Sequence, residues 1–358
     1  MNDLSKLVIV GTSRVDANSE QSFPSKTENN IWVQTVPYDF DTLADRTVRL
    51  LPDYIKPHVN TVIVCSAADD SYARMKTYHS ERARPRDVLG ALGISLTTTV
   101  NKHFPKVSNI FKVDAACASG LYAIDVAKNY KNIDNGIIVI AGVEKSTSFN
   151  FLNLFKKIGA VAQDSDESYA PFDSRRAGFV MGEGAAMLAI TTEKYATHHQ
   201  LKILATIDSV DTCTILTHPT SPSDPEKLKT FIENTIQDSG RSLEEISWWD
   251  AHATATPDGD QAEYDIFSRI FKDQETVISS YKSRIGHCMS ASSVVEIANA
   301  IEQLQSDQAS PTYNLKRENT MVDDTRIILN SCSVKSRTFI KTSFGFGGRN
   351  GVAVITVC

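Results

Sequence analysis

Asp114-Ala-Ala-Cys117-Ala-Ser-Gly120-Leu-Tyr-Ala123 follows an apolar run that ends at Val113 and opens a pattern of small residues that continues to about Ala127. The change of pattern predicts a strand-to-helix junction with Cys117 at the junction. A thiol reacts as its thiolate, and the N-terminus of a helix favours that anion. We therefore predict a lowered pKa for Cys117 and a nucleophilic role. The alternative is a buried structural cysteine, since free cysteine is among the most buried residue types.

Short β-branched runs alternate with longer helical patterns, which is typical of an α/β fold with buried strands. In the first half these runs lie at 7–10, 61–64, 111–113 and 136–140. In the second half we predict strands near 179–191, 201–214, 246–251, 276–281, 326–330 and 351–357, and helices at 224–238, 260–271 and 291–305. The strand, turn and small-residue helix around Cys117 recur in pattern from Val277 to Ala291, which suggests two copies of one topology. Strand-turn-helix units occur in every α/β protein, so this similarity of pattern alone does not demonstrate a duplication.

The composition is that of an ordinary folded protein of 358 residues, with 41% hydrophobic and 22% charged residues. The net charge of −6 argues against a nucleic-acid-binding protein, which needs a basic surface to neutralise phosphates. The scattered cysteines lack CxxC spacing, so we expect neither a metal site nor a disulfide framework. The sequence has no charged leader with a long apolar segment and no apolar run of membrane-spanning length, so we expect a cytoplasmic protein that does not bind a membrane.

One segment is strongly basic although the protein is acidic. It contains Arg74, Lys76, Arg82, Arg84 and Arg86. One interpretation is a solvated loop or helix face, and the other is a docking surface for an acidic partner.

Three further segments combine polar side chains with tight turns at the ends of predicted strands, where α/β active sites gather. They are Trp248-Trp-Asp-Ala-His252-Ala-Thr-Ala-Thr-Pro257-Asp-Gly-Asp260, Ser280-Tyr-Lys282-Ser-Arg-Ile-Gly-His287 and Thr342-Ser-Phe344-Gly-Phe346-Gly-Gly348-Arg-Asn350. Each alone has a structural explanation. Together with Cys117 they supply a nucleophile, two imidazoles, a lysine and a glycine-rich turn of N–H donors. This combination favours covalent catalysis with a stabilised oxyanion.

With these segments the chain resembles the β-ketoacyl-acyl carrier protein synthases of the thiolase superfamily, in particular their elongating, Cys-His-His type. The resemblance covers nearly all of residues 111–358. It also includes Pro171-Phe-Asp173-Ser-Arg-Arg-Ala-Gly178-Phe-Val-Met-Gly182-Glu183-Gly-Ala185, Thr217-His218-Pro-Thr-Ser221 and Ala291-Ser-Ser-Val-Val-Glu296. The resemblance implies a thiolase-like α/β fold, in which two similar βαβαβαββ halves form a five-layer αβαβα sandwich. We expect the halves at 1–192, with the nucleophile, and 193–358, with the histidines and lysine, packed as one compact unit.

The resemblance also assigns roles to particular residues. It implies that Cys117 accepts an acyl chain as a thioester, and that His252, His287 and Lys282 complete the catalytic set. The implied oxyanion hole is formed by the backbone N–H groups of Cys117 and Phe346, and the implied supporting residues are Glu296 and Asp260. Contacts to the pantetheine arm or the substrate are implied for Thr254, Thr256, Phe346 and Phe155, and docking of the carrier protein for Arg74, Arg82 and Arg84.

The implied reaction is a decarboxylative Claisen condensation of the acyl group with malonyl-acyl carrier protein, in a specialised fatty-acid, polyketide or polyene pathway. Two histidines are wanted because loss of CO₂ leaves an enolate whose oxygen needs hydrogen-bond donors. The resemblance implies no cofactor of the protein's own, because the acyl carrier protein brings the phosphopantetheine. It also implies a homodimer, or a heterodimer with a related synthase subunit.

Two alternatives stay open at this point. A chain-length-factor-like partner subunit would be non-condensing, although such subunits typically lack the nucleophilic cysteine. A coenzyme A-dependent thiolase usually has a second catalytic cysteine in the C-terminal half; the turn at Phe344–Gly348 offers none, and Cys288, directly after His287, is expected to face elsewhere. The chain also departs from the family: Ala253 and Ala255 replace common glycines, Arg349 replaces a threonine, and the part before Cys117 is short. The acyl-chain specificity is therefore open.

Overall fold

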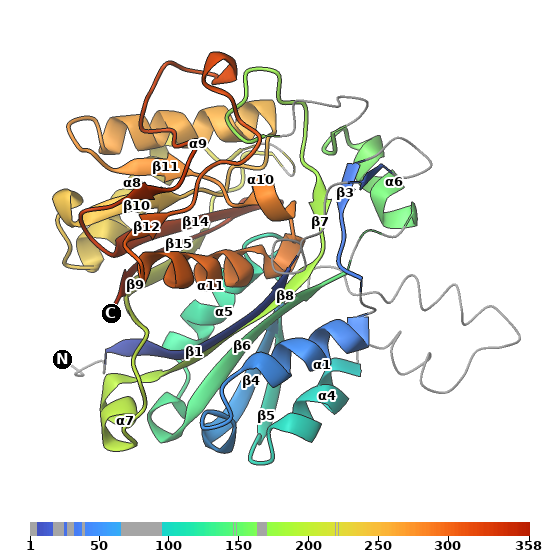
Figure 1. Cartoon of the computed structure of the whole chain (residues 1–358), viewed down its shortest axis with the longest axis vertical. Coiled ribbons are helices and arrows are strands. Elements are labelled where there is room, and N and C mark those ends of the chain that lie inside the picture. The colour runs from blue at the N-terminus through green and yellow to red at the C-terminus, as the bar shows by residue number, and fades with distance from the viewer. Residues whose placement is uncertain are drawn as a thin grey trace, which may run out of the picture.

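The computed structural model describes residues 6–16, 25–26, 32–37, 40–65, 95–145, 147, 149–162, 170–218, 220 and 222–358. Its centre is a ten-stranded mixed sheet (Figure 1). The strands lie in the order β11 (Val277–Ser279), β10 (Ile246–Asp250), β14 (Thr338–Gly345), β15 (Arg349–Val357), β9 (Ala205–Thr214), β1 (Leu7–Asp16), β8 (Gly184–Thr192), β6 (Ile137–Glu144), β4 (Val59–Cys65) and β5 (Asn109–Val113).

The two halves of this sheet have the same topology. In the first half, the chain forms the strands in the order β1, β4, β5, β6, β8. From the outer edge of the sheet to its centre, these strands lie in the order β5, β4, β6, β8, β1, which is third, second, fourth, fifth, first along the chain. The second half repeats this order: from its outer edge to the centre, the strands are β11, β10, β14, β15 and β9. In each half the fifth strand is antiparallel to both of its neighbours. The antiparallel pairing of β1 with β9 joins the halves, so the predicted duplication of topology is confirmed.

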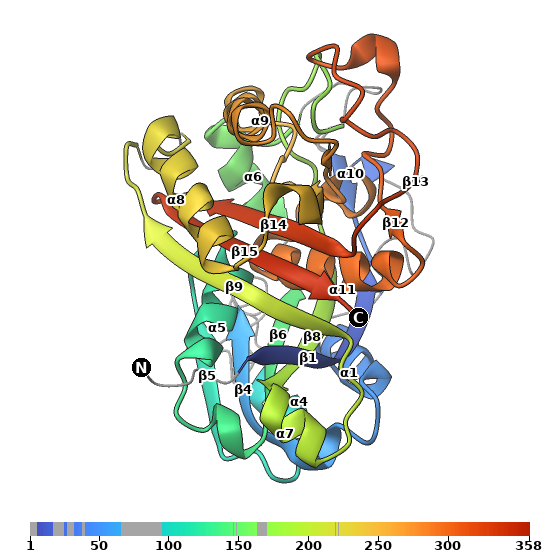
Figure 2. The same cartoon turned by 90° about the vertical axis from the view of Figure 1, so that its left-hand side faces the viewer.

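Helices form three layers around the two half-sheets (Figures 1 and 2). The central pair, α5 (Ser119–Lys128) and α11 (Ser292–Leu304), contacts strands of both halves. The outer layer of the first half contains α1 (Phe40–Leu50), α4 (Ser95–His103) and α7 (Glu193–His198). The outer layer of the second half contains α8 (Pro225–Asp238) and α9 (Pro257–Ile270). The five-layer αβαβα sandwich is therefore confirmed.

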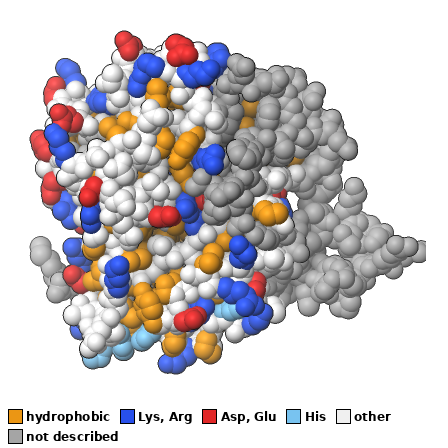
Figure 3. Space-filling model, viewed as in Figure 1, with side chains coloured by type: hydrophobic (Ala, Val, Ile, Leu, Met, Phe, Trp, Pro, Cys, Tyr) orange, Lys and Arg blue, Asp and Glu red, His pale blue; other side chains and the backbone are white. Residues whose placement is uncertain are grey.

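The remaining elements lie outside these layers. They are α6 (Phe149–Lys157), the short helix α10 (Lys282–Ile285), a small sheet of β2 (Ser25–Lys26), β3 (Trp32–Gln34) and β7 (Met181–Gly182), and the pair β12 (Gln308–Ala309) and β13 (Cys332–Ser333). The basic segment with Arg74, Arg82 and Arg84 lies outside the described residues. On the face in Figure 3, the described acidic and basic side chains are interspersed.

The central helices approach each other closely at Gly120. A Cβ atom there would lie 2.9 Å from Ser293 Cβ and 3.0 Å from Val294 Cγ2. Side chains in protein interiors are packed at the density of organic crystals, so the neighbouring helix has little room to yield. Because Gly120 has no side chain, α5 and α11 can lie close together in one layer.

Replacing Gly120 by alanine is expected to lower the free energy of unfolding by about 1–3 kcal/mol, because the overpacked methyl group outweighs the higher helix propensity of alanine. Urea denaturation followed by far-UV circular dichroism measures this loss. The matched control is Val126→Ala on the same helix, where the side chain is 43% exposed and the expected change is within about 0.5 kcal/mol. Equal stability of the two variants would contradict the close packing.

Two details of the second half differ from the sequence prediction. The strand predicted at 326–330 is wrong: only Ile327 forms a bridge, with Ile278. Its partner strand β11 has three residues and offers few backbone groups for pairing. The strand β14 was not predicted, because Lys341 and the hydroxyl residues after it interrupt the apolar pattern although they are buried.

Candidate active site

The four segments singled out in the sequence converge on one cavity of about 470 Å³. Cys117 enters it from the start of α5, His252 from the end of β10, His287 from the turn after α10, and Phe346 from the turn between β14 and β15. The described residues that line it also include Phe155, Ile158, Phe179, Ala253, Thr254, Thr256, Met289, Phe344 and Gly345.

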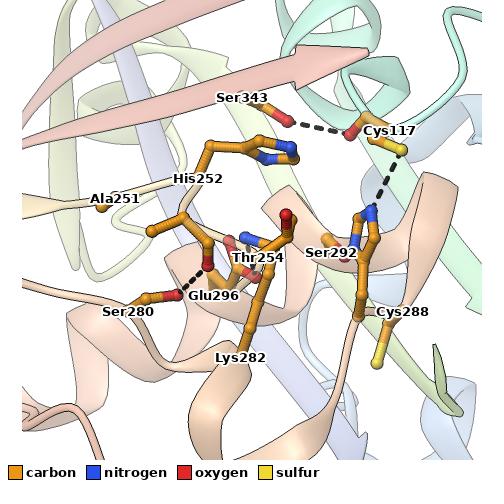
Figure 4. A network of polar contacts seen from close by, with 12 residues as sticks. Cys117, Ala251, His252, Thr254, Ser280, Lys282, Cys288, Ser292, Glu296 and Ser343 are labelled. Atoms are coloured by element: carbon orange, nitrogen blue, oxygen red, sulfur yellow. Dashed lines mark hydrogen bonds and ion pairs between the residues drawn. The ribbon is translucent and has the colours of Figure 1, made fainter. Parts of the chain in front are cut away.

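Cys117 lies between β5 and α5, at the predicted strand-to-helix junction. The preceding residue, Ala116, has a φ of 50°, in the left-handed region that an alanine rarely adopts. Ser119 stabilises this turn: its Oγ donates a hydrogen bond to Ala116 O at 2.6 Å and accepts one from Ala115 N at 2.9 Å. From β14, Ser343 Oγ donates to Cys117 O at 2.8 Å (Figure 4). The two halves of the fold therefore hold the cysteine together.

The predicted lowering of the Cys117 pKa is wrong. Burial raises the pKa of this thiol to about 12, and the nearby Lys282 ammonium offsets only part of the effect. Desolvation disfavours the thiolate, and α5 begins only at Ser119, after the cysteine. Cys117 is therefore a thiol near neutral pH, and its reaction requires a proton acceptor within hydrogen-bond distance.

His287 provides that acceptor. Its Nε2 lies 3.0 Å from Cys117 Sγ, and its Nδ1 lies 2.9 Å from Ser292 Oγ (Figure 4). Burial, together with Lys282 and Lys341, moves the pKa of His287 well below its usual range, so the ring is neutral. A neutral imidazole carries one donor and one acceptor nitrogen. We assign the proton to Nδ1, facing Ser292, because Nε2 then accepts the thiol proton.

His252 faces the same space from the other side of the cavity. Its ring centroid lies 5.5 Å from that of His287, with the ring planes at 82°. Burial moves the pKa of His252 well below its usual range, and the charges of Lys282 and Lys341 act in the same direction. Among the described residues, Nδ1 of His252 has no hydrogen-bond partner. This neutral ring can direct a hydrogen bond toward a bound molecule.

Two carboxylates of α9 hold the loop that carries His252. Glu263 accepts hydrogen bonds from His252 N at 3.0 Å and from Ala253 N at 2.8 Å. Asp260 accepts from Thr254 N at 2.9 Å and from Ala255 N at 3.1 Å. Burial raises the pKa of Asp260 to about 7, although hydrogen bonds from Phe172 N and Thr254 N and the charge of Arg176 lower it. Asp260 was expected from the sequence, whereas Glu263 was not, although it is an acidic residue three positions later on the same helical face.

The loop also contains both alanines that replace family glycines. Ala253 lines the cavity, whereas Ala255 is fully buried and is not among the described lining residues. Ala255 has a φ of 67°, while Ala253 does not have a positive φ. A left-handed conformation costs a residue with a Cβ atom about 1–2 kcal/mol.

Replacing Ala255 by glycine is expected to cost about 1 kcal/mol less stability than replacing Ala253 by glycine. Both changes remove a buried methyl group and both add backbone freedom, so only the relief of the left-handed strain differs. Urea unfolding of the two variants and the wild type measures the difference. Equal losses would show that the loop relaxes and stores no strain at residue 255.

Four charged side chains are buried directly behind the histidines. Lys282 Nζ lies 2.7 Å from Glu296 Oε1, a pair visible in Figure 4. Lys341 pairs with the other oxygen of Glu296 and lies 3.2 Å from Asp250 Oδ2. Glu296 was expected from the sequence as a supporting residue, whereas Lys341 and Asp250 were not identified. In the sequence, the signal for each of these two residues was an isolated charge within a buried strand, Asp250 in β10 and Lys341 in β14.

Three other residues predicted to contact the substrate line the cavity, whereas Arg349, which replaces a family threonine, lies elsewhere. Thr254, Thr256 and Phe155 line the cavity, and the Phe155 ring stacks on Phe346 with centroids 6.3 Å apart. Arg349 is not among the described lining residues and instead donates to Asp114 O at 2.8 Å, just before the cysteine turn.

Cys288 does not supply the second catalytic cysteine of a thiolase, because it is not among the described residues that line the cavity. Its side chain points away from Cys117 into the core, where Sγ lies 3.9 Å from Ile285 O (Figure 4). Within the described part of the chain, no group of three or more ligating side chains is arranged to hold a metal ion. No helix in that part is long and apolar enough to cross a membrane.

Comparisons with known proteins show the family of the chain. The N-terminal domain of the β-ketoacyl synthases matches residues 58–196, and their C-terminal domain matches residues 204–316. The chloroplastic 3-oxoacyl-[acyl-carrier-protein] synthase I of Hordeum vulgare is 32% identical over 251 residues, which are 68% of this chain and 54% of that protein. The 3-oxoacyl-[acyl-carrier-protein] synthase 2 of Coxiella burnetii is 27% identical over 80% of this chain and 71% of its own length.

Two solved structures support the fold. One is the ketosynthase of a type II polyketide synthase in complex with its acyl-carrier protein, with a TM-score of 0.84 at 19% identity over 99% of this chain and all of the other. The second is the ishigamide ketosynthase/chain length factor, with a TM-score of 0.82 at 20% identity over 99% of each chain. The chain belongs to the β-ketoacyl synthase family of the thiolase superfamily. It spans about half the length of the barley relative.

Proposed function

We propose that this protein is an acyltransferase that condenses an acyl group held on Cys117 with malonyl-acyl carrier protein, releasing CO₂ and β-ketoacyl-acyl carrier protein. The observation that carries the proposal is the 3.0 Å contact of Cys117 Sγ with His287 Nε2 in a cavity that His252 also lines. Named relatives with this activity in chloroplasts and in bacteria support it.

In the first half-reaction, Cys117 Sγ attacks the carbonyl carbon of an acyl thioester. The thiol proton passes to His287 Nε2, and the bond between the acyl carbon and the carrier's sulfur breaks. Backbone N–H groups of Cys117 and Phe346 are our proposed donors to the oxyanion, because both residues line the cavity. The departing carrier thiolate takes the thiol proton from His287, which returns to its neutral state.

In the second half-reaction, the bond between the carboxylate and the α-carbon of the malonyl group breaks, and CO₂ leaves. The electron pair forms an enolate, whose oxygen receives hydrogen bonds from the ring N–H groups of His252 and His287, because the neutral His287 ring can carry its proton on Nε2 once the thiol is acylated. The enolate carbon then attacks the acyl carbon on Cys117. A carbon–carbon bond forms, the bond to Sγ breaks, and the cysteine thiolate takes up a proton from solvent.

The proposed partner is an acyl carrier protein, which brings the phosphopantetheine arm as part of the substrate. Thr254 and Thr256 are our proposed contacts for the arm, because both residues line the cavity and their hydroxyl oxygens lie 3.2 Å from each other. Docking through Arg74, Arg82 and Arg84 stays a proposal from the sequence. We also propose the cytoplasm as the compartment, because the cysteines of the described residues are free thiols, as reducing compartments maintain.

We further propose a homodimer or a heterodimer with a related subunit, in which each chain divides into halves at 1–192 and 193–358. The edge strand β5 supports the dimer: it has one strand partner among the described residues and leaves Phe111 39% exposed. An unpaired edge with an exposed aromatic side chain is a surface that another chain can cover.

Two assays test the proposed function: release of CO₂ from malonyl-acyl carrier protein, and formation of β-ketoacyl-acyl carrier protein with donors of different acyl length. Intact-mass spectrometry of the acyl-enzyme identifies the chain that Cys117 accepts. Absence of both reactions with every donor would reject the condensing role. Activity that appears only with a second synthase-like chain would assign the protein to a heteromeric synthase.

A further inference from the structure

Lys341 is a fully buried lysine that the proposed reaction does not use. Its ammonium group lies 3.2 Å from Asp250 O, 3.3 Å from Ala251 O and 3.2 Å from Asp250 Oδ2, and it pairs with Glu296. Two backbone carbonyl groups and two carboxylates therefore surround a single cation.

These oxygen atoms belong to the segments that carry the candidate catalytic groups. The carbonyl groups of Asp250 and Ala251 directly precede His252, so Lys341 fixes the backbone from which that ring projects. Glu296, through its other oxygen, pairs with Lys282 at 2.7 Å. On its own strand, Lys341 precedes by two residues Ser343, which binds the carbonyl of the cysteine.

The charges of this group balance, since Lys282 and Lys341 face Asp250 and Glu296. Burial opposes a charge on Lys341, but the two carboxylates outweigh it and raise the pKa of Lys341. Lys341 therefore stays a cation near neutral pH, and it lowers the pKa of both histidines. Among the described residues, the titratable groups near the two rings include Cys117 at the start of α5, Asp250 on β10, Glu263 on α9, Lys282 on α10, Glu296 on α11, Lys341 on β14 and, beside Cys117, Glu144 on β6.

We propose that Lys341 is a positioning residue for the condensation: its ammonium group fixes the strand end that carries His252 and, through Glu296, holds Lys282 in place. The proposal rests on the proposed function. By removing the cation, a variant loosens the loop of His252 and makes both rings easier to protonate, so fewer of them remain neutral at neutral pH.

The test compares three variants with the wild type: Lys341→Met, the double variant Asp250→Asn/Lys341→Met, and Lys335→Met. The last is the control, because the side chain of Lys335 is 83% exposed. The double variant removes one positive and one negative charge, so its buried group stays neutral and it should fold even where Lys341→Met does not. We expect kcat for malonyl decarboxylation to fall roughly 10- to 100-fold in both Lys341 variants, as when a residue that orients a reacting group is lost. The acid limb of the pH profile should move to higher pH, and KM should change little.

A readout without turnover accompanies these rates, namely NMR titration of the histidine rings in selectively labelled protein. His252 and His287 should take up protons at higher pH in the double variant than in the wild type. If the double variant recovers both the wild-type rate and the wild-type titration, Lys341 only balances Asp250 and the proposal is wrong. If the wild type itself does not decarboxylate malonyl-acyl carrier protein, the proposed function fails, while the titration still tests the effect of Lys341 on the rings.

Discussion

The Cys117→Ala protein is expected to form no acyl-enzyme and to lose condensation by at least about 10⁴-fold, the scale on which removal of a catalytic nucleophile acts. Decarboxylation of malonyl-acyl carrier protein should continue within about tenfold of the wild-type rate, because the enolate donors His252 and His287 remain. Intact-mass spectrometry after incubation with an acyl donor measures the first effect, and release of CO₂ measures the second. The two half-reactions would thereby be separated in one variant.

Cys288→Ala is the matched control, since this thiol is also fully buried but points into the core. It should keep both the acyl-enzyme and condensation. An acyl group found on the Cys117→Ala protein would contradict the assignment of the nucleophile. Loss of condensation in Cys288→Ala with the fold intact would reopen the thiolase alternative.

The His252→Ala protein is expected to lose malonyl decarboxylation by about 10²–10³-fold, the usual effect of removing one donor to an oxyanion. Acyl transfer to Cys117 should be largely kept, because the contact of His287 Nε2 with Sγ at 3.0 Å does not involve His252. Stopped-flow release of CO₂ and mass-spectrometric loading of the enzyme measure the two effects separately.

His252→Asn and His287→Ala complete this experiment. Asparagine keeps an N–H donor and should recover part of the decarboxylation. His287→Ala should slow both half-reactions, because it removes an enolate donor and also the acceptor of a thiol proton whose pKa burial raises to about 12. Equal loss of acyl transfer in His252→Ala and His287→Ala would contradict the division of roles proposed here.

Much of the fold could be predicted from the sequence because buried strands of a two-sided sheet are continuous apolar runs. All eight residues of β6 are buried, for example, and its apolar run was recognisable. The strand β14 was missed for the converse reason. Its Lys341 and Thr342 are buried as partners of Asp250 and Glu263, which lie far away in the sequence. No local pattern reveals such pairs.

The candidate site could also be predicted in part. Residues in the distinctive turns, such as Cys117 and His287, were identified by their types and by the resemblance to a family. Glu263 and Lys341 were not, because their roles arise from backbone groups that only the folded chain brings to them. The state of the Cys117 thiol was mispredicted because the helix start is local information, whereas burial comes from segments of both halves.

Small oxidants such as peroxide attack thiolates far faster than thiols, and they reach exposed sulfur first. Cys117 is 6% exposed and protonated, whereas Cys358 is exposed. The nucleophile becomes reactive only when its proton passes to His287, at the moment a thioester carbonyl lies beside Sγ. The same burial that makes the resting cysteine a weak nucleophile therefore protects it from irreversible oxidation between turnovers.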